Sequence, residues 1–358
     1  MGTLTVDLAA ISANYQQIQS ITGRNCAVSA VVKANAYGCG MAPVASALRQ
    51  AGAAKFFIAT LPEGLELRTI IGEEPEVYML GGFDPENSDL YTAENITPVL
   101  NSLDEIESYS ALASENGKSL PAILHIDTGM NRLGLEKQDL ATVQEKLQGI
   151  DVQYVMSHFA CADEKDAPMN EAQYETFKAA AETFPNIPKS LANSSGIFRS
   201  PDYHFDMVRP GMSLYGLNPT PETDNPMHRA VTLNVEVLQV KDVEGGETCG
   251  YGATHRFGNN SKLAILSMGY ADGFLRSLSN NGALYWKNYK CPVRGVVSMD
   301  LTIVDLSAVP ENELPTPGDM LEVIGPNQSA DDLAAACGTI GYEILTSLSR
   351  RYQRVYKD

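Results

Sequence analysis

The stretch AVVKANAYGCG, residues 30–40, combines an apolar strand pattern with a lysine and a Gly-rich turn. Small and β-branched residues run directly into Lys33, and an Asn, a Tyr and two glycines follow. The apolar part is typical of a buried strand, and the glycines indicate a turn immediately after it. A lysine at such a strand end is usually only solvated, so its meaning depends on what ends the other strands.

Strand-length apolar runs alternate with helical patterns over the first two thirds of the chain. The runs cover residues 26–32, 55–60, 76–80, 97–100, 121–127, 152–158, 189–193 and 205–209. Several are apolar throughout, as are strands that are covered on both faces. Eight βα units predict an α/β fold in which a (β/α)8 barrel of the TIM type closes, and an open doubly wound sheet is the alternative.

The pattern changes after the Pro-rich stretch 218–230. Alternating apolar and polar residues replace the helical patterns until residue 329, which indicates a second, mostly-β domain. We therefore expect a barrel domain over residues 1–222 and a C-terminal mostly-β domain over 223–358. The first eight or so residues could pair with the β domain.

The composition narrows the possible partners and the compartment. The 358 residues carry a net charge of −18, from 44 acidic and 26 basic residues, which argues against nucleic acid or an anionic membrane as a partner. We find no signal peptide and no apolar stretch of membrane-spanning length. The six cysteines form no CxxC pair and are expected to be reduced. The sequence predicts a cytoplasmic protein, with no metal site.

In a βα barrel the chemistry lies at the carboxyl ends of the strands, so the residues that follow each apolar run are the candidates for a site. They are Lys33, Tyr37, Arg132, His158, Asn193, Ser194 and Arg209. Each has a plain structural explanation: His158 could be a hydrogen-bonded core residue, and Ser194 could cap a helix. Such explanations do not predict that a lysine, two arginines and a histidine collect at one rim.

The turns after the last two predicted strands resemble a phosphate site. The segments NSSG, 193–196, and RPGMS, 209–213, supply small residues and free backbone amides. A lysine, a phosphate site and a cation for a ring nitrogen are what pyridoxal phosphate requires. The sequence therefore predicts pyridoxal 5'-phosphate as cofactor.

Eight sequence motifs resemble those of the bacterial alanine racemase family. They occur in the same order and with similar spacing, along essentially the whole chain. They are VVKANAYGCG at 31–40, HIDTGMNRLG at 125–134, SHFA at 157–160, LANSSG at 191–196, RPGMSLYG at 209–216, GYGATH at 250–255, MGYADG at 268–273 and VSMD at 297–300. The resemblance implies an isomerase that interconverts L-alanine and D-alanine and supplies D-alanine for peptidoglycan. It also implies a homodimer with shared active sites.

The resemblance also implies a role for each matching residue. Lys33 is similar to the cofactor lysine and one catalytic base, and Tyr251 to the second base, which reaches the site from the partner subunit. The cofactor-binding positions are Lys33, Tyr37, His158, Asn193, Ser194, Arg209, Gly211 and Met212. Arg132 and Met299 match substrate-carboxylate contacts, and Tyr270 and Asp300 match the entrance.

These roles agree with the chemistry of racemisation. Two bases on opposite faces can remove and return the α-proton without moving, and cations near Tyr251 would favour its basic form. Arg209 would leave the cofactor ring nitrogen unprotonated, because a guanidinium scarcely gives up its proton. The ring is then a weak electron sink, which favours return of the proton over side reactions.

Three residues depart from the family pattern. Cys39 stands where a histidine is common, and His125 where many members have a carbamylated lysine that orients the substrate-binding arginine. Arg350 stands where many have a tyrosine. A broader serine and alanine racemase is therefore an open alternative. A pyridoxal-phosphate decarboxylase of the same fold is a further one, against which Arg209 and Tyr251 speak, and a non-catalytic cofactor carrier would leave the β domain unexplained.

Overall fold

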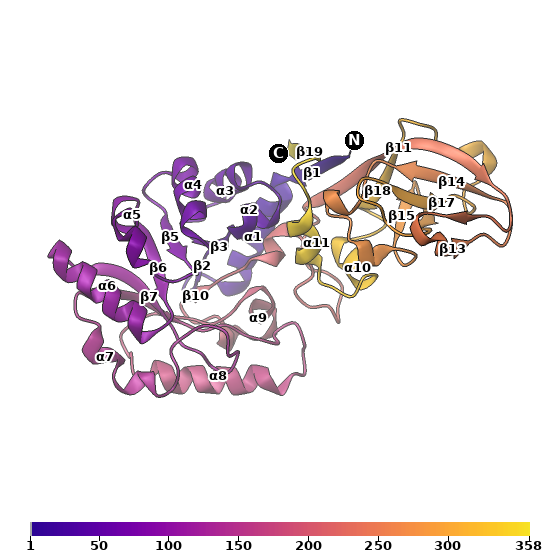
Figure 1. Cartoon of the computed structure of the whole chain (residues 1–358). Coiled ribbons are helices and arrows are strands. Elements are labelled where there is room, and N and C mark those ends of the chain that lie inside the picture. Colours follow the sequence, from indigo (N-terminus) through magenta and orange to yellow (C-terminus); the bar gives the residue numbers. More distant parts are fainter. Residues whose placement is uncertain (1) are drawn as a thin grey trace. The chain divides into compact units, whose positions relative to one another are not determined.

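The computed structural model describes residues 2–358 and divides the chain into two compact units. One, the barrel unit, comprises residues 10–36 and 40–228. The other, the β unit, comprises residues 2–9, 37–39 and 229–358. Each unit is described below by itself, and Figure 1 shows the course of the chain through both.

The barrel unit is built on parallel strands. Seven form one sheet in chain order: β3 (Ala30–Val31), β4 (Lys55–Ile58), β5 (Glu76–Met79), β6 (Ile96–Leu100), β7 (Leu120–His125), β8 (Ile150–Met156) and β9 (Lys189–Ser190). β10 (Met207–Val208) pairs in parallel with β2 (Ala27–Val28), and an isolated parallel bridge joins Asn193 to Arg209. Because β2 and β3 are one strand interrupted at Ser29, these pairings close the predicted eight-stranded barrel.

Helices cover the outside of these strands in the barrel unit (Figure 1). They are α1 (Leu8–Thr22), α3 (Met41–Gln50), α4 (Leu61–Ile71), α5 (Ser88–Ala93), α6 (Leu103–Asn116), α7 (Val143–Lys146), α8 (Pro168–Ala181) and α9 (Ser194–Arg199). The short segment α2 (Lys33–Tyr37) follows β3. Phe56, Phe57 and Ile58 of β4 are fully buried, as expected for a strand that is covered on both faces.

The β unit contains a twisted, mainly antiparallel sheet around the long strand β11 (Val231–Val243). Its other strands are β1 (Thr3–Asp7), β14 (Ser261–Leu266), β15 (Ala283–Trp286), β16 (Tyr289–Pro292), β17 (Thr302–Asp305), β18 (Met320–Ile324) and β19 (Gln353–Lys357). β1 pairs antiparallel with β11 and parallel with β19. Burial alternates along the first half of β11, which agrees with the alternating sequence pattern.

Smaller elements complete the two units. The β unit also holds the hairpin of β12 (Thr248–Cys249) and β13 (His255–Arg256), with helices α10 (Ala330–Ala335) and α11 (Gly341–Ser347). Short 3-10 helices are η1 (Pro85–Asn87), η2 (Asp139–Ala141), η3 (Pro201–Tyr203), η4 (Met212–Tyr215), η5 (Tyr251–Ala253), η6 (Tyr270–Asp272), η7 (Arg276–Leu278) and η8 (Glu311–Glu313).

Two properties of the described residues bear on the sequence predictions. No helix within residues 2–358 has both the length and the apolar character needed to span a bilayer. All six cysteines are free thiols.

Candidate active site

Lys33 stands directly after the first barrel strand, at the start of an unusual turn. Ala34, Asn35, Ala36 and Tyr37 have φ values of 53 to 54°, so α2 is a left-handed turn made of residues other than glycine. Such a turn costs about 1–2 kcal/mol per residue. The turn is stable because hydrogen bonds from neighbouring segments hold its backbone, and a backbone held in this way fixes the direction of its side chains.

The contacts that hold this turn come from its own flanks and from the C-terminal strand. Asn35 Oδ1 accepts the amide of Met41 at 2.8 Å, which ties the turn to the start of α3. In the β unit, the Gly38 carbonyl accepts from Arg354 of β19 at 3.1 Å. A Cβ at Gly38, where φ is +80°, would lie 2.3 Å from the carbonyl oxygen of Leu345, so only glycine fits there.

The amine of Lys33 lies in an environment that favours its neutral form. Partial burial lowers the pKa of Lys33, the charge of Arg132 lowers it further, and the carboxylate of Glu63 raises it. A lysine is a base only when it is neutral, so a lowered pKa suits the amine to take a proton.

Arg209 is a buried cation in the barrel, 4% exposed. Its Nη atoms donate to Ser190 Oγ, to the carbonyls of Ser157 and Leu191, and to His158 Nδ1 at 3.5 Å. Within residues 2–358 its Nε–H has no acceptor. Burial lowers the pKa of Arg209, but a guanidinium stays protonated at neutral pH. This donor is suited to a ring nitrogen that carries no proton.

His158 and His125 lie beside this cation and are neutral. Burial and the charge of Arg209 lower the pKa of His158 well below its usual value. The same causes, with Arg132, lower the pKa of His125 to about 4. Since His158 Nδ1 accepts from Arg209, its proton is on Nε2.

The tautomer of His125 is fixed by Asn101, a residue that the sequence did not single out. His125 Nδ1 lies 2.8 Å from Asn101 Oδ1, and Asn101 Nδ2 donates to the carbonyl of Val99 at 2.8 Å. The Asn101 oxygen is therefore the acceptor, so His125 carries its proton on Nδ1 and presents a lone pair on Nε2.

The two turns that were predicted to hold a phosphate are joined through Ser194. Asn193 caps α9 by accepting the amide of Gly196 at 3.0 Å. Ser194 Oγ accepts the amides of Gly211 at 2.9 Å and Ser213 at 3.3 Å. Met212 begins η4, where the first amides have no partner within the helix. Short side chains and amides at adjacent turns fit an anionic group such as a phosphate.

The remaining predicted site residues belong to the β unit. Tyr251 begins η5 and is 72% exposed, while Met299 is 52% and Tyr270 is 42% exposed. The amide of Tyr270 donates to Ser298 at 3.0 Å, and that of Ala271 to Met299 at 3.0 Å. Tyr270 and Met299 therefore lie on joined segments at the surface of the β unit.

Two further residues of the β unit bear on the predicted entrance. Asp300 accepts from Arg351 at 2.6 Å, and Arg351 also reaches Asp272 at 3.4 Å. The Asp272 carboxylate in turn accepts the amide of Gly269, directly before η6. Arg350, the departure noted in the sequence, is exposed.

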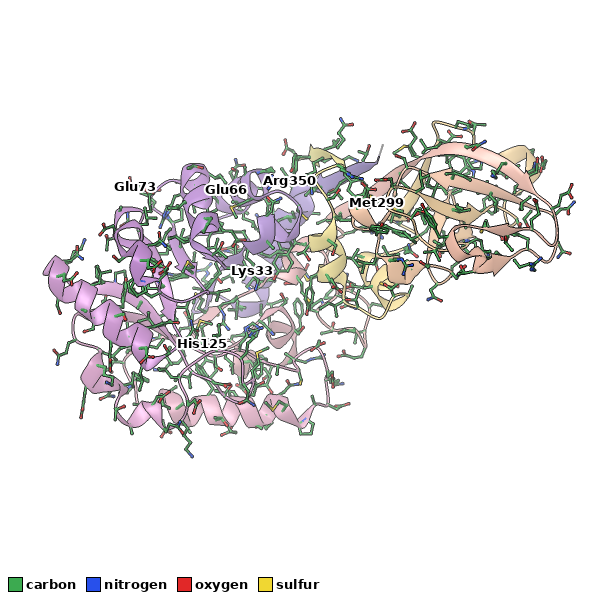
Figure 2. All side chains as sticks on the ribbon, viewed as in Figure 1. Lys33, Glu66, Glu73, His125, Met299 and Arg350 are labelled. Atoms are coloured by element: carbon green, nitrogen blue, oxygen red, sulfur yellow. The ribbon has the colours of Figure 1, made fainter. Side chains whose placement is uncertain are left out.

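The structure thus divides the predicted site residues between the two units. The barrel unit brings together Lys33, Arg132, His158, Asn193, Ser194, Arg209, Gly211 and Met212; the β unit holds Tyr37, Tyr251, Tyr270, Met299 and Asp300. Burial raises the pKa of the Tyr37 hydroxyl, which therefore stays protonated. Figure 2 shows Lys33 and His125 on the barrel unit, and Met299 and Arg350 on the β unit.

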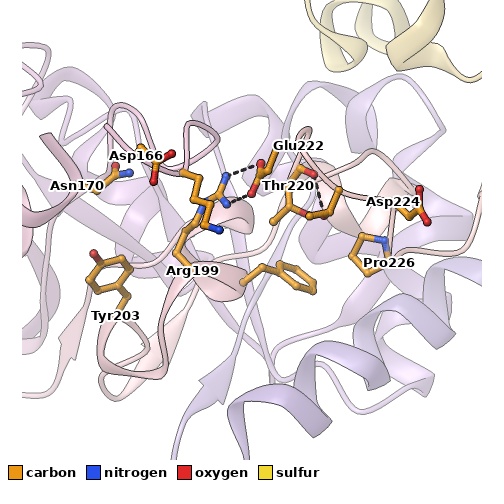
Figure 3. A pocket seen from close by; sticks show the side chains of 11 residues that line it. Asp166, Asn170, Arg199, Tyr203, Thr220, Glu222, Asp224 and Pro226 are labelled. Atoms are coloured by element: carbon orange, nitrogen blue, oxygen red, sulfur yellow. Dashed lines mark hydrogen bonds and ion pairs between the residues drawn. The ribbon is translucent and has the colours of Figure 1, made fainter. Parts of the chain in front are cut away.

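A hollow elsewhere on the barrel unit contains none of the predicted site residues (Figure 3). An ion pair between Arg199 and Glu222 crosses it. Arg199 also donates to the carbonyls of Ala162 and Asp163, so its donors are used in joining loops. We therefore assign the chemistry to the barrel rim at Lys33. Among residues 2–358, no group of three or more His, Cys, Asp or Glu side chains is placed to hold a metal ion.

Two family profiles match the chain, one over most of each unit. The family profile described as "Alanine racemase, N-terminal domain" matches residues 6–219, and "Alanine racemase, C-terminal domain" matches 230–356. A relative from Agrobacterium fabrum named "Alanine racemase, catabolic" is 44% identical over 358 residues, 99% of this chain and 92% of the relative. An "Alanine racemase" from Acidiphilium cryptum is 44% identical, over 99% of this chain and 98% of the relative.

Solved structures give the same result. The alanine racemase from Bartonella henselae with covalently bound pyridoxal phosphate superimposes with a TM-score of 0.94, at 38% identity and with 99% of both chains covered. The biosynthetic alanine racemase from Pseudomonas aeruginosa has a TM-score of 0.93 at 33% identity, with 100% of this chain and 99% of that chain covered.

Proposed function

This chain belongs to the alanine racemase family, and from that premise we propose that it interconverts L-alanine and D-alanine with two bases, Lys33 and Tyr251 of a second subunit. The enzyme is an isomerase, an alanine racemase, and its cofactor is pyridoxal phosphate. The observation that carries the proposal is a half-buried lysine with a lowered pKa in the same barrel as a buried arginine whose Nε has no acceptor within residues 2–358.

The residues of the barrel rim fit this cofactor. Lys33 would hold it covalently, Arg209 would donate to its ring nitrogen, and the phosphate would lie at the turns of Ser194, Gly211 and Met212. Tyr37, His158 and Asn193 complete the proposed cofactor set. When bound, the cofactor withdraws electrons from the α-carbon of the amino acid, so that its proton can leave.

The protein's own part is to move one proton at each face of the α-carbon. The neutral amine of Lys33 serves one face, since burial and Arg132 lower its pKa. The phenol of Tyr251 serves the other face. Arg209 donates a hydrogen bond to His158, which links this buried cation to the rim where the tyrosine would act.

Arg132 and Met299 are proposed to hold the substrate carboxylate, and Tyr270 and Asp300 to line the entrance. Arg132 is exposed, and its charge acts on Lys33, His125 and His158. Within residues 2–358 no ion pair joins Arg132 to an acidic side chain, so its guanidinium is suited to bind a carboxylate.

We propose a homodimer with shared active sites. A catalytic tyrosine that is 72% exposed needs another surface to exclude water from its hydroxyl. The domains proposed are a cofactor-binding barrel over 1–222 and a β domain over 223–358 that contributes Tyr251. A cytoplasmic location, without membrane or nucleic-acid partners, and supply of D-alanine for peptidoglycan are part of the proposal.

One experiment tests the activity and the cofactor lysine together. The purified holoenzyme is mixed with L-alanine, D-alanine and carbon dioxide are measured, and borohydride then fixes the cofactor for peptide mapping. We expect D-alanine without carbon dioxide, and label on Lys33. Label on another lysine contradicts the site, and carbon dioxide release would favour a decarboxylase. The same assay with L-serine measures the broader racemase activity that the His125 and Arg350 departures raise.

A further inference from the structure

Glu63 makes contacts that a helix-capping residue does not need. It lies in the first turn of α4, where it forms a capping box with Thr60. Its Oε2 accepts the amides of Ala59 at 2.8 Å and Thr60 at 3.3 Å. Its Oε1 accepts the amide of Ala34 at 2.7 Å, the shortest of the three. Ala34 is 29 residues earlier in the chain and belongs to the turn that follows the preceding strand.

The hydrogen bond from the Ala34 amide to Glu63 lies next to the proposed cofactor lysine. Ala34 directly follows Lys33 and is the first residue with a left-handed φ. A carboxylate that accepts its amide fixes the peptide plane between Lys33 and Ala34, where the strand ends and the strained turn begins. The hydrogen bond therefore restricts the direction in which the Lys33 side chain leaves the backbone.

Glu63 also places a negative charge near the amine. The charges that act on Lys33 are Arg132, from the loop after β7, and Glu63, from α4; Lys33 in turn acts on His158, from the loop after β8. Arg132 and Glu63 act in opposite directions, so Glu63 limits how far the amine is shifted toward its neutral form.

From these contacts we infer that Glu63 is a positioning residue for the reaction: it holds the turn that aims Lys33 and sets the charge balance at its amine. The inference rests on the proposed function in taking Lys33 as the cofactor lysine. It assigns Glu63 no contact with the substrate or with the cofactor.

Simple capping is the alternative, and the chain contains a residue for comparison. Glu105 occupies the same position in the first turn of α6, where Ser102 is the N-cap. Its carboxylate accepts the amide of Asn101 at 2.8 Å and also receives a backbone hydrogen bond from Phe83, in the turn after β5. Glu105 thus shows that a capping glutamate of this barrel can also accept a backbone amide from another loop for structural reasons alone. The test therefore has to separate helix capping by Glu63 from positioning of Lys33.

The test measures how fast the cofactor-free full chain takes up pyridoxal phosphate at different pH values, by visible absorbance. Uptake requires the neutral Lys33 amine, which adds to the cofactor aldehyde with loss of water. Glu63→Gln removes the charge, so the pH of half-maximal uptake should fall by about half a unit. Thr60→Ala weakens the same helix cap without touching Ala34, and it should leave that pH unchanged.

A second measurement separates the contact from the charge. Glu63→Asp keeps the charge but is one methylene shorter, so the Ala34 amide should exchange with deuterium at least fivefold faster than in the parent, while Thr60→Ala should not change it. This readout also applies if Glu63→Gln does not fold.

The outcomes are distinguishable from failure of the proposed function. If borohydride does not label Lys33 in the parent protein, the proposed function and this inference both fail. If Lys33 is labelled, but Glu63→Gln behaves like Thr60→Ala in uptake or Glu63→Asp leaves the Ala34 exchange unchanged, Glu63 only caps α4.

Discussion

The barrel rim and the exposed loops of the β unit contribute to the candidate site in opposite ways. At the rim, the side chains are held by neighbours in the same chain: Arg209 is 4% exposed, with four partners on its Nη atoms. In the β unit, Tyr251 is 72% exposed and Met299 52% exposed. One chain therefore holds the proposed cofactor side of the site in place but leaves Tyr251, the proposed second base, exposed to solvent.

The largest loss is expected at the rim. Lys33→Ala removes both the covalent hold on the cofactor and one base, so racemisation should fall by about 10⁴-fold or more. The measurement is D-alanine formation from L-alanine by the purified variant. Retention of a tenth of the parent activity would contradict the role of Lys33.

Loss of the second base is expected to be smaller and one-sided. Tyr251→Phe should slow removal of the α-proton from L-alanine by about 10³-fold and from D-alanine far less, because Lys33 still serves the other face. The equilibrium between the enantiomers fixes the ratio of kcat/KM in the two directions, so racemisation rates cannot show this difference. Exchange of the α-proton of each enantiomer with deuterated water can show it, and equal losses would argue against two bases.

The free energy of unfolding of the chain should decrease at low pH, because protonation of His125 destabilises the folded state. Its pKa is lowered to about 4 in the folded chain and lies near 6.5 in an unfolded chain, so the unfolded state binds the proton more tightly. Neutral His125 makes its full contribution to the free energy of unfolding above pH 6.5. This contribution, at most about 3 kcal/mol, is lost as the pH falls to 4.

Unfolding by urea at pH 7 and pH 4.5, with parent and His125→Asn, measures this term. The variant should lose less stability than the parent over this interval, since Asn does not titrate. An identical loss of stability in both proteins would mean that folding does not lower the pKa of His125.

The smallest effect in this series concerns reaction specificity. Arg209→Glu would protonate the cofactor ring nitrogen and strengthen the electron sink, so transfer of the amino group to the cofactor should rise by roughly tenfold relative to racemisation. Pyridoxamine phosphate formed during turnover of alanine is the quantity to measure. Clean racemisation by this variant would contradict the proposed role of Arg209.

The same contrast explains what the sequence could predict. The eight strands and the barrel were predictable because buried parallel strands are continuous apolar runs. Helix ends are equally local signals: Ser102 caps the start of α6, and Gly117 ends it in a left-handed conformation. Lys33, Arg209 and Ser194 could be singled out because they directly follow such strands.

Contacts between distant segments could not be predicted in this way. The pairing of His125 with Asn101 joins neighbouring barrel strands 24 residues apart in the chain, and periodicity carries no signal for it. The pattern TLPE at 60–63 indicates that Glu63 caps a helix, but its contact with Ala34 depends on where the turn of the preceding unit lies. The left-handed turn itself contains Ala34 and Ala36, and alanine rarely adopts that conformation, so the turn could not be predicted from these residues.

The proposed mechanism requires that each active site takes Lys33 from one chain and Tyr251 from another. The direct test is to mix the inactive variants Lys33→Ala and Tyr251→Phe, allow the subunits to exchange, and measure racemisation. Half of the dimers would then be mixed, and each would hold one complete site, so activity should recover to about one quarter of the parent. A mixture that exchanges subunits and stays as inactive as its components would contradict the shared site.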